Sequence, residues 1–273
     1  MASPPPDPFI FSSSDGPDRG PCYRADVDAT VLAPRSDAAS TGSPLVARWL
    51  GRRGYRSAHA LQKRLVTERA DGLIGDQLLL LEHPAVLTLG RNSDPAHIRA
   101  TDADLERRGI EVVRVERGGE VTYHGPGQLV AYPIVALHER GLLLRPFVRA
   151  LEAALVETCA ADGVAAARRD GHPGCWCDPD GPAPRKIGAL GLRIERGVSY
   201  HGIALNVTVD LDDFELIDPC GMPGTISTSI ARERGDLDAV PSTDSVARAA
   251  DTFARAFAAA IAAPLELEPG EPA

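Results

Sequence analysis

The chain has 273 residues, 44% of them hydrophobic, and a formal net charge of −9 at neutral pH. This length suffices for one sizeable core, or for one core with a small lobe. The negative charge argues against general nucleic-acid binding, which needs a basic face. No apolar run reaches the roughly 18 residues that would cross a bilayer. Residues 1–20 also lack the basic and apolar regions of a signal peptide, so we expect a cytoplasmic protein without a membrane segment.

Residues 1–43 predict an extension that does not fold by itself. They contain seven prolines, several serines and few large apolar residues. Such a segment cannot bury enough apolar surface to offset the entropy lost on ordering. We therefore expect a disordered extension over 1–43 and a folded catalytic domain over 44–268.

The first half of the folded region predicts one helix and several strands. The helix covers 57–71, where Ala58, Leu61 and Leu65 share one face and Gly72 is a stop signal. Between residues 117 and 127, four glycines and a proline require loops at both ends of the segment. Strand-like runs occur at 77–81, 85–89, 111–115 and 128–135.

The second half predicts two helices that flank a hairpin. The helix over 146–162 has an apolar stripe that includes Cys159, and the last helix covers 244–262. Alternating apolar residues predict paired strands over 186–194 and 198–209, with a turn at 195–197. The Gly/Pro-rich residues 170–185 predict a loop, as do most of residues 210–230. Because helices and strands do not alternate strictly, we expect an α+β or mixed α/β fold with a mixed sheet.

Five cysteines are present, and Cys220 has the sequence context that best suits a reactive thiol. Its surroundings, DPCGMPG, predict a loop in which a thiol is exposed and backbone amides can approach it. A thiolate nucleophile also needs a nearby cation. Cys175 and Cys177 lie close to His172, but a structural zinc site commonly has four ligands. We therefore expect no metal site.

Lys186 is unusual because the chain has 27 arginines and only two lysines, Lys63 and Lys186. Where arginine supplies nearly every positive charge, a lysine indicates a task that arginine cannot perform, such as releasing a proton. Lys186 follows the Gly/Pro-rich segment and opens a predicted strand.

Two histidines share an aromatic-His-Gly context, His124 in YHG and His201 in YHG. The glycine-rich segment around His124 fits neither the phosphate-binding loop nor the dinucleotide-binding pattern. We therefore infer neither ATP nor NAD from it and expect no cofactor.

Three segments together resemble one known family. RGGEVTYHGPGQLVAYPI at 117–134, KIGALGLRIERGVSYHGIALNV at 186–207 and DPCGMPG at 218–224 are similar to the octanoyltransferases of lipoate biosynthesis and occur in that family's order. EHP at 82–84, followed by LTLGR at 87–91, fits the same family. The likeness runs from about residue 45 to 265.

This resemblance implies the biotin/lipoate protein ligase fold and transfer of octanoyl or lipoyl through a cysteine thioester. The implied donor is octanoyl-acyl carrier protein. The implied acceptors are lipoyl domains of 2-oxoacid dehydrogenase complexes and the glycine cleavage H protein. The implied catalytic pair is Cys220 and Lys186. The implied substrate-binding residues are Arg117, Gly118, Gly119, Glu120, Val121, Thr122, Tyr123, His124, Ala189, Leu190, Gly191, Gly202, Ile203 and Ala204.

Two alternatives remain open from the sequence. An ATP-dependent lipoate or biotin ligase of the same fold class would activate a free acid and would not need Cys220. A non-catalytic scaffold would instead bind metal through His172, Cys175 and Cys177.

Overall fold

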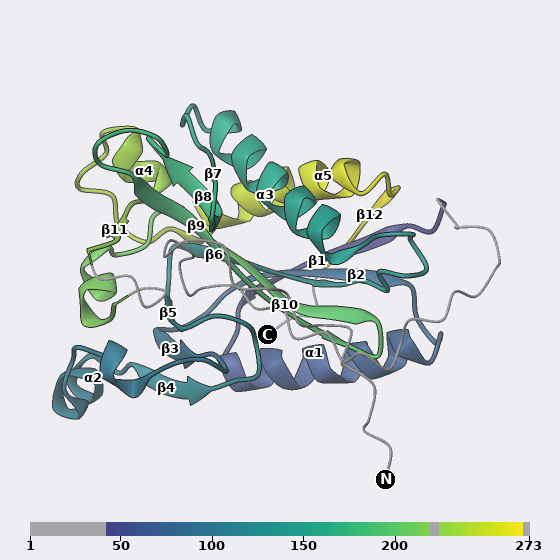
Figure 1. Ribbon diagram of the computed structural model, residues 1–273, viewed down its shortest axis with the longest axis horizontal. Coiled ribbons are helices and arrows are strands. Elements are labelled where there is room, and N and C mark those ends of the chain that lie inside the picture. Colours follow the sequence, from purple (N-terminus) through teal and green to yellow (C-terminus); the bar gives the residue numbers. More distant parts are fainter. Residues whose placement is uncertain (1–41, 219–223, 270–273) are drawn as a thin grey trace, which may run out of the picture.

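A computed structural model describes residues 42–218 and 224–269 of the chain (Figure 1). Nearly all of the predicted extension, and Cys220 itself, lie outside these residues. Within the described part of the chain, no helix is both long and apolar enough to span a membrane.

A mixed sheet runs through the centre of the domain. Its nine described strands follow the order β12-β1-β2-β6-β10-β9-β8-β7, with β11 paired to β9. β1 is parallel to both β2 and β12, and β11 is parallel to β9, whereas the other neighbours are antiparallel. The strands are β1 Leu45–Arg52, β2 Asp76–Glu82, β6 Gln128–Ile134, β7 Ala167–Arg169, β8 His172–Cys177, β9 Arg185–Glu195, β10 Val198–Asn206, β11 Ile226–Ser227 and β12 Leu265–Glu268. The mixed sheet predicted from the sequence is therefore confirmed.

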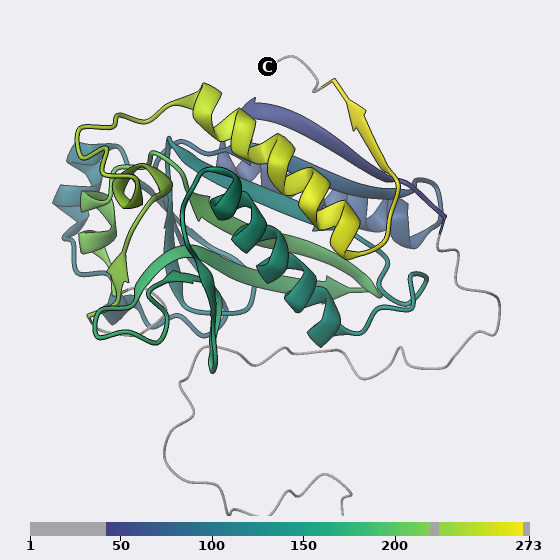
Figure 2. The ribbon, with the colours of Figure 1, turned by 90° about the horizontal axis from the view of Figure 1, so that it is seen from above.

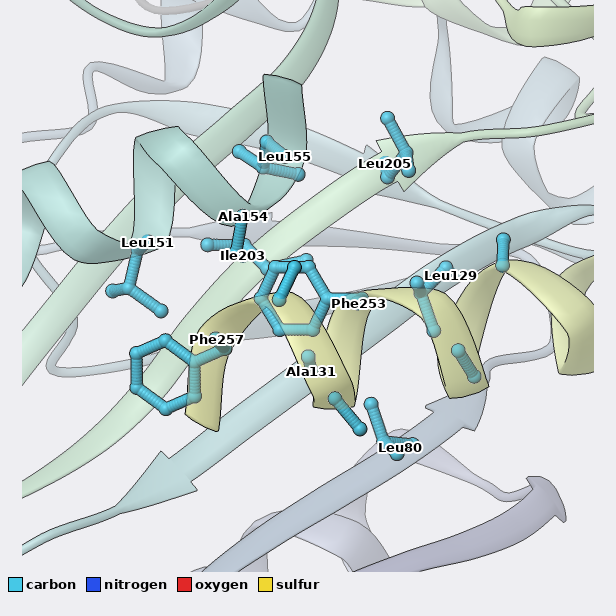
Figure 3. Packing of buried hydrophobic residues seen from close by; sticks show 14 of the residues in the cluster. Leu80, Leu129, Ala131, Leu151, Ala154, Leu155, Ile203, Leu205, Phe253 and Phe257 are labelled. Atoms are coloured by element: carbon cyan, nitrogen blue, oxygen red, sulfur yellow. The ribbon is translucent and has the colours of Figure 1, made fainter. Parts of the chain in front are cut away.

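Helices α3 (Leu144–Ala161) and α5 (Thr243–Ala260) cover one face of this sheet (Figures 1 and 2). Their apolar stripes pack onto inward-facing residues of the central strands, including Leu80, Leu129 and Ile203 (Figure 3). The rings of Phe253 and Phe257 are stacked with centroids 6.0 Å apart. These packed apolar faces form the main core and leave the opposite face of the sheet for the site.

The opposite face carries helix α1 (Tyr55–Ala70) and a small second sheet (Figure 1). That sheet has the order β4-β3-β5, with β3 at Val86–Leu89, β4 at Glu111–Arg114 and β5 at Val121–His124. Helix α2 (Asp102–Arg108) leads into β4, after the short 3-10 helix η1 (Pro95–His97). A turn at residues 125–127 joins β5 to β6, so the glycine-rich segment links the two sheets.

The three predicted helices are confirmed, and each begins and ends within two residues of its expected bounds. The predicted loop over 170–185 is wrong in its first half, because residues 172–177 form β8. Cys175, Trp176 and Cys177 are at most 1% exposed, and β8 pairs with β9. Burial and pairing there outweigh the turn signals of the neighbouring glycines and proline.

The predicted strand over 198–209 is shorter than expected, because β10 ends at Asn206. The backbone amides of Val207 and Thr208 donate instead to the carbonyl of Gly127. The prediction that most of residues 210–230 form a loop is only partly confirmed. In the described ranges 210–218 and 224–230, half of the residues lie in the 3-10 helix η2 (Asp212–Leu216), in β11 and at the start of α4 (Ile230–Glu233).

Candidate functional site

A pocket opens where β9 and β10 meet the loop before β5 and the first turn of α1. Its walls combine apolar and small residues of the strands with histidines, tyrosines and charged side chains. The lining residues are Tyr55, Arg117, Gly119, Glu120, Val121, Thr122, His124, Tyr132, Pro173, Lys186, Ala189, Leu190, Gly191, His201, Gly202, Ile203 and Ala204.

Small residues make room for the pocket along the β9–β10 pair. Gly191 pairs with Gly202, and Ala189 pairs with Ala204, so none of these four positions carries a side chain larger than a methyl group. Gly202 also lies tight against β6, because a Cβ added there would come within 1.9 Å of the Ala131 carbonyl oxygen. Gly202 therefore tolerates no larger residue, whereas Leu190 and Ile203 supply the large apolar side chains of the same strands to the pocket.

Arg117 fixes the loop that forms another wall. Its buried guanidinium donates to the carbonyl oxygen of Thr88 at 2.7 Å and to the Thr88 hydroxyl at 2.8 Å. The amide of the next residue, Gly118, donates to the Leu192 carbonyl on β9 at 3.0 Å. The loop is thus held between the small sheet and β9, and Gly119 turns there with a φ of 88°.

A chain of buried hydrogen bonds connects His124 to the segment beside Lys186. His124 Nδ1 donates to Gln128 Oε1 at 2.7 Å, and Gln128 Nε2 donates to Asn206 Oδ1 at 2.9 Å. Asn206 Nδ2 in turn donates to the Thr228 carbonyl at 2.9 Å, and the Thr228 amide donates to the Lys186 carbonyl at 3.0 Å. Because the proton of neutral His124 is on Nδ1, its Nε2 is a hydrogen-bond acceptor.

Lys186 lies near the start of β9, in a position that holds its side chain against the pocket. The residue is 8% exposed, and its Nζ lies 5.2 Å from the centre of the Trp176 ring. Gly174 leaves space for it, since a Cβ there would be 3.1 Å from Lys186 Cε. A single amine, buried and held over an indole, therefore faces the small-residue strands.

The His83 ring is buried and contacts two polar groups. Its Nε2 lies 2.8 Å from the Tyr132 hydroxyl and its Nδ1 lies 2.7 Å from the Arg53 carbonyl oxygen. Burial lowers the pKa of His83 to about 4. Burial, with the nearby charges of His83 and Arg117, lowers the pKa of His124 to about 3. Both rings are therefore neutral at pH 7 in the folded protein.

The structure brings together most of the residues expected to bind substrate, although they come from three separate segments. Gly118 and Tyr123 do not line the pocket. Tyr123 points into a separate apolar cluster, where its hydroxyl donates to Asp213 Oδ2 at 2.5 Å. Cys220 lies outside the described residues.

Several pocket residues were missing from the expected set. His201 had a sequence signal in its aromatic-His-Gly context, and Tyr132 belonged to one of the segments that carried the resemblance. Tyr55 and Pro173 had no comparable signal. Tyr55 enters the pocket because α1 begins beside it, a tertiary relation that local patterns do not report.

The cysteines at 159, 175 and 177 are packed into the main core and are each at most 1% exposed. A hydrogen bond with Cys175 and burial raise the pKa of Cys159. Burial raises the pKa of Cys177 to about 12. The two thiols of the CxC pair are thus core residues, and the His172 ring packs edge-on against Trp176 instead. The alternative of a metal scaffold built on His172, Cys175 and Cys177 is therefore not supported.

The model of the lipoyl protein ligase A/B catalytic domain matches residues 54–258, which is well over half of the chain. The chain belongs to this family. An octanoyltransferase from Acidobacterium capsulatum is 49% identical over 216 residues, covering 76% of this chain and 88% of the relative. Octanoyltransferases from Chloroflexus aggregans and Syntrophobacter fumaroxidans are 48% and 46% identical, each over 68% of this chain and over 83% and 79% of the relative.

Solved structures of lipoate ligases share the family fold. A putative lipoate protein ligase from T. acidophilum with bound lipoic acid aligns with a TM-score of 0.56 at 15% identity, covering 84% of this chain and 90% of that chain. A lipoate-protein ligase A bound with ATP aligns with a TM-score of 0.55 at 16% identity and the same coverage. The expected ligase-like fold is thereby confirmed.

Because the buried histidines are neutral in the folded protein, we expect the free energy of unfolding to depend on pH. The unfolded ring of His124 takes up a proton near pH 6.5, whereas the folded ring does so only near pH 3. The unfolded state therefore binds more protons below pH 6.5, and each such histidine lowers stability by about 1.4 kcal/mol per pH unit as the pH falls. The free energy of unfolding, measured with urea between pH 6 and 4, should fall less steeply with decreasing pH in His124→Gln than in the wild type, by about this amount per pH unit. His138→Gln, at an exposed position, is the control and should show the same pH dependence as the wild type. The same pH dependence in all three proteins would contradict the claim that buried His124 destabilises the fold at low pH.

Gly202 should not tolerate even one added methyl group. Gly202→Ala would force its Cβ against the Ala131 carbonyl, and overpacking of this kind costs about 2–3 kcal/mol. For a domain of this size we expect a Tm lower by roughly 4–12 °C in a thermal scan. Gly75→Ala is the matched control, because an added Cβ there meets nothing within 4 Å. If both variants melt alike, the close approach of β10 to β6 is not a constraint.

Proposed function

We propose that this protein transfers an octanoyl group from acyl carrier protein to a lysine of lipoyl domains, through a thioester on Cys220. The observation that carries the proposal is the position of Lys186 in a pocket walled by small and apolar residues of β9 and β10. Relatives that are up to 49% identical over most of the chain bear the name octanoyltransferase, which supports the same activity.

The pocket walls suit an unbranched acyl chain. Val121, Leu190 and Ile203 offer apolar contacts, and the paired glycines and alanines allow the chain to approach the backbone closely. Lys186 and His124 bring polar groups to the same pocket. An octanoyl tail would lie among the apolar residues, with its carbonyl directed toward the polar ones.

The described chain on both sides of Cys220 is attached next to this pocket. The Asp218 amide donates to the His97 carbonyl at 2.8 Å, and His97 Nδ1 lies 3.3 Å from the pocket residue Glu120. On the other side, Ser227 pairs with Lys186 between β11 and β9. Cys220 is only two residues from Asp218, so these attachments support its proposed role beside Lys186.

In the first half-reaction, the Cys220 thiolate attacks the carbonyl carbon of the carrier thioester. The new C–S bond to Cys220 replaces the C–S bond to the pantetheine arm, and the departing thiolate takes a proton from the Lys186 ammonium. The ammonium also favours the thiolate form of Cys220, because an adjacent cation lowers the pKa of a thiol. One thioester replaces another, so this step is nearly balanced in free energy.

In the second half-reaction, neutral Lys186 accepts a proton from the ammonium of the acceptor lysine. The freed amine attacks the acyl-enzyme, an amide forms, and the Cys220 thiolate leaves paired with the Lys186 ammonium. The second proton of the acceptor amine is released to water. The amide is more stable than the thioester, so the transfer runs downhill without an external energy source.

The proposed protein partners are octanoyl-acyl carrier protein as donor, and lipoyl domains of 2-oxoacid dehydrogenase complexes and the glycine cleavage H protein as acceptors. An ATP-dependent ligase would act on free octanoate instead. The structural likeness to an ATP-bound ligase is at 16% identity and concerns the fold alone.

The deciding experiment is the intact mass of the enzyme after mixing with octanoyl-acyl carrier protein, in the absence of an acceptor. We expect a gain of one octanoyl group that hydroxylamine removes, followed by transfer when a lipoyl domain is added. A second sample receives free octanoate and ATP. Lipoyl-domain modification in that sample, with no mass gain from the carrier thioester, would establish a ligase and overturn the proposal.

A further inference from the structure

His59, Glu116 and His201 form a cluster beside the pocket, between α1 and the main sheet. His59 is on α1, Glu116 lies just after β4, and His201 is on β10. His59 Nε2 is 3.2 Å from Glu116 Oε1, and the rings of His59 and His201 are stacked with centroids 5.4 Å apart. One ligand atom from each residue lies within 4.8 Å of the other two.

His201 has a buried nitrogen whose hydrogen-bonding capacity is unused within the described chain. The residue is 1% exposed, and its Nε2 has no hydrogen-bond partner. A buried polar atom without a partner costs free energy, so it calls for an explanation. The backbone of His201 adopts a φ of 54°, which is uncommon for a residue other than glycine. A strained backbone that buries an unpartnered imidazole nitrogen points to a ligand for that nitrogen.

The protonation states of the cluster suit a cation. Burial lowers the pKa of His201 well below its usual value, together with the nearby charges of Arg117 and His59. Burial acts to raise the pKa of Glu116, but hydrogen bonds from its own amide and from Tyr200 lower it overall, as do the two histidines. At pH 7 the buried imidazole is therefore neutral and the carboxylate is ionised, which are the forms that bind metal.

We propose that His59, Glu116 and His201 bind a divalent transition-metal ion of the Zn²⁺ class. Two imidazoles and one carboxylate are a known three-ligand set for zinc, with a fourth position left for water or another ligand. Calcium and magnesium prefer oxygen ligands and are disfavoured by two nitrogens. No local sequence pattern indicates this site, because its ligands come from three segments separated by more than fifty residues each.

The Lys63 ammonium would compete with a metal ion for the carboxylate of Glu116. Its Nζ lies 3.5 Å from Glu116 Oε1 and 3.1 Å from Glu195 Oε2. The Lys63 side chain is 43% exposed, so it can keep its ion pair with Glu195 and move away from Glu116 when a metal ion binds. Removing the lysine charge should therefore strengthen metal binding, whereas removing a ligand should weaken it.

The site goes beyond the proposed acyl transfer and does not depend on it. A metal ion there would link α1 to β10, and because His201 also lines the pocket, it would fix one of the pocket's walls. We therefore expect bound Zn²⁺ to raise the Tm of the enzyme.

The test titrates the full-length, untagged Cys220→Ser protein with Co²⁺, whose visible absorption reports its ligands, and then displaces it with Zn²⁺ in a calorimeter. The serine removes the proposed nucleophilic thiol, which could otherwise compete for metal. We expect one equivalent to bind with a nitrogen and oxygen spectrum. His59→Ala and Glu116→Gln should weaken affinity by more than the tenfold to hundredfold typical of an outer-shell loss. Lys63→Gln should strengthen affinity, and His138→Ala, on the exposed surface, should leave it unchanged.

His59 is three-quarters buried but lies at the rim of the cluster, so circular dichroism without metal first establishes that each variant is folded. A sulfur-to-cobalt absorption band would place the metal on one of the four remaining cysteines, Cys22 or the buried Cys159, Cys175 and Cys177, and would overturn the proposal. The proposal is also overturned if the wild type, His59→Ala and Glu116→Gln bind Co²⁺ with the same affinity, or if the protein does not bind one equivalent of Co²⁺. Because metal binding is read directly, these outcomes are independent of whether acyl transfer occurs.

Discussion

Replacing Cys220 by serine should abolish both the acyl-enzyme and the transfer of octanoyl to a lipoyl domain. Serine is a much weaker nucleophile unless a strong base activates it, and the pocket offers an amine that is proposed to be protonated at the start of the reaction. The intact mass after mixing with octanoyl-acyl carrier protein should stay unchanged, and turnover should fall to background.

Cys175→Ala provides the control for this variant. Cys175 is fully buried in the main core, so its loss should reduce stability while leaving the acyl-enzyme intact. Transfer by Cys220→Ser at near the wild-type rate would show that no thioester on Cys220 is needed.

Lys186→Arg should slow both half-reactions by roughly a hundredfold or more, as is typical when a general acid–base group is lost. The guanidinium keeps the positive charge and so can still favour the Cys220 thiolate. It does not release a proton in the working pH range. Single-turnover measurements of acyl-enzyme formation and of transfer to the lipoyl domain would report the two half-reactions separately.

The larger guanidinium must also fit beside Trp176 and Gly174, where Lys186 Cε already lies close to the backbone. Iodoacetamide separates this steric effect from the loss of proton transfer. Rapid alkylation of Cys220 together with lost transfer would support proton transfer by Lys186. Transfer within a few-fold of wild type would leave Lys186 with an electrostatic role alone.

The sequence predicts the fold well where local patterns agree with tertiary packing. The helices at 57–71, 146–162 and 244–262 have strong apolar stripes, and they occur nearly where expected. The turn at 195–197 fixes the register of β9 and β10, and that register places Gly191 opposite Gly202. β8 was missed because His172, Pro173 and Gly174 read as a turn, whereas its pairing with β9 is a contact between distant segments.

The candidate site is less accessible to sequence reasoning, because its parts meet only in the folded chain. The three pocket segments were grouped by their resemblance to a family and not by their own patterns. Nothing local links His59 to Glu116, or Tyr55 to His83, whose rings lie 5.0 Å apart. Histidine clusters of this kind arise from the packing of α1 against both sheets, and single-sequence periodicity carries no signal for it.

The scarcity of lysine gives this enzyme few amines that the proposed thioester chemistry could modify. Lys186 is 8% exposed inside the pocket, and Lys63 is held in ion pairs with Glu116 and Glu195. Stray self-acylation on the surface of the folded domain is therefore restricted mainly to one side chain. The same scarcity makes amine-selective labels useful, because a reagent that reaches only exposed side chains would mark Lys63 and spare the amine in the pocket.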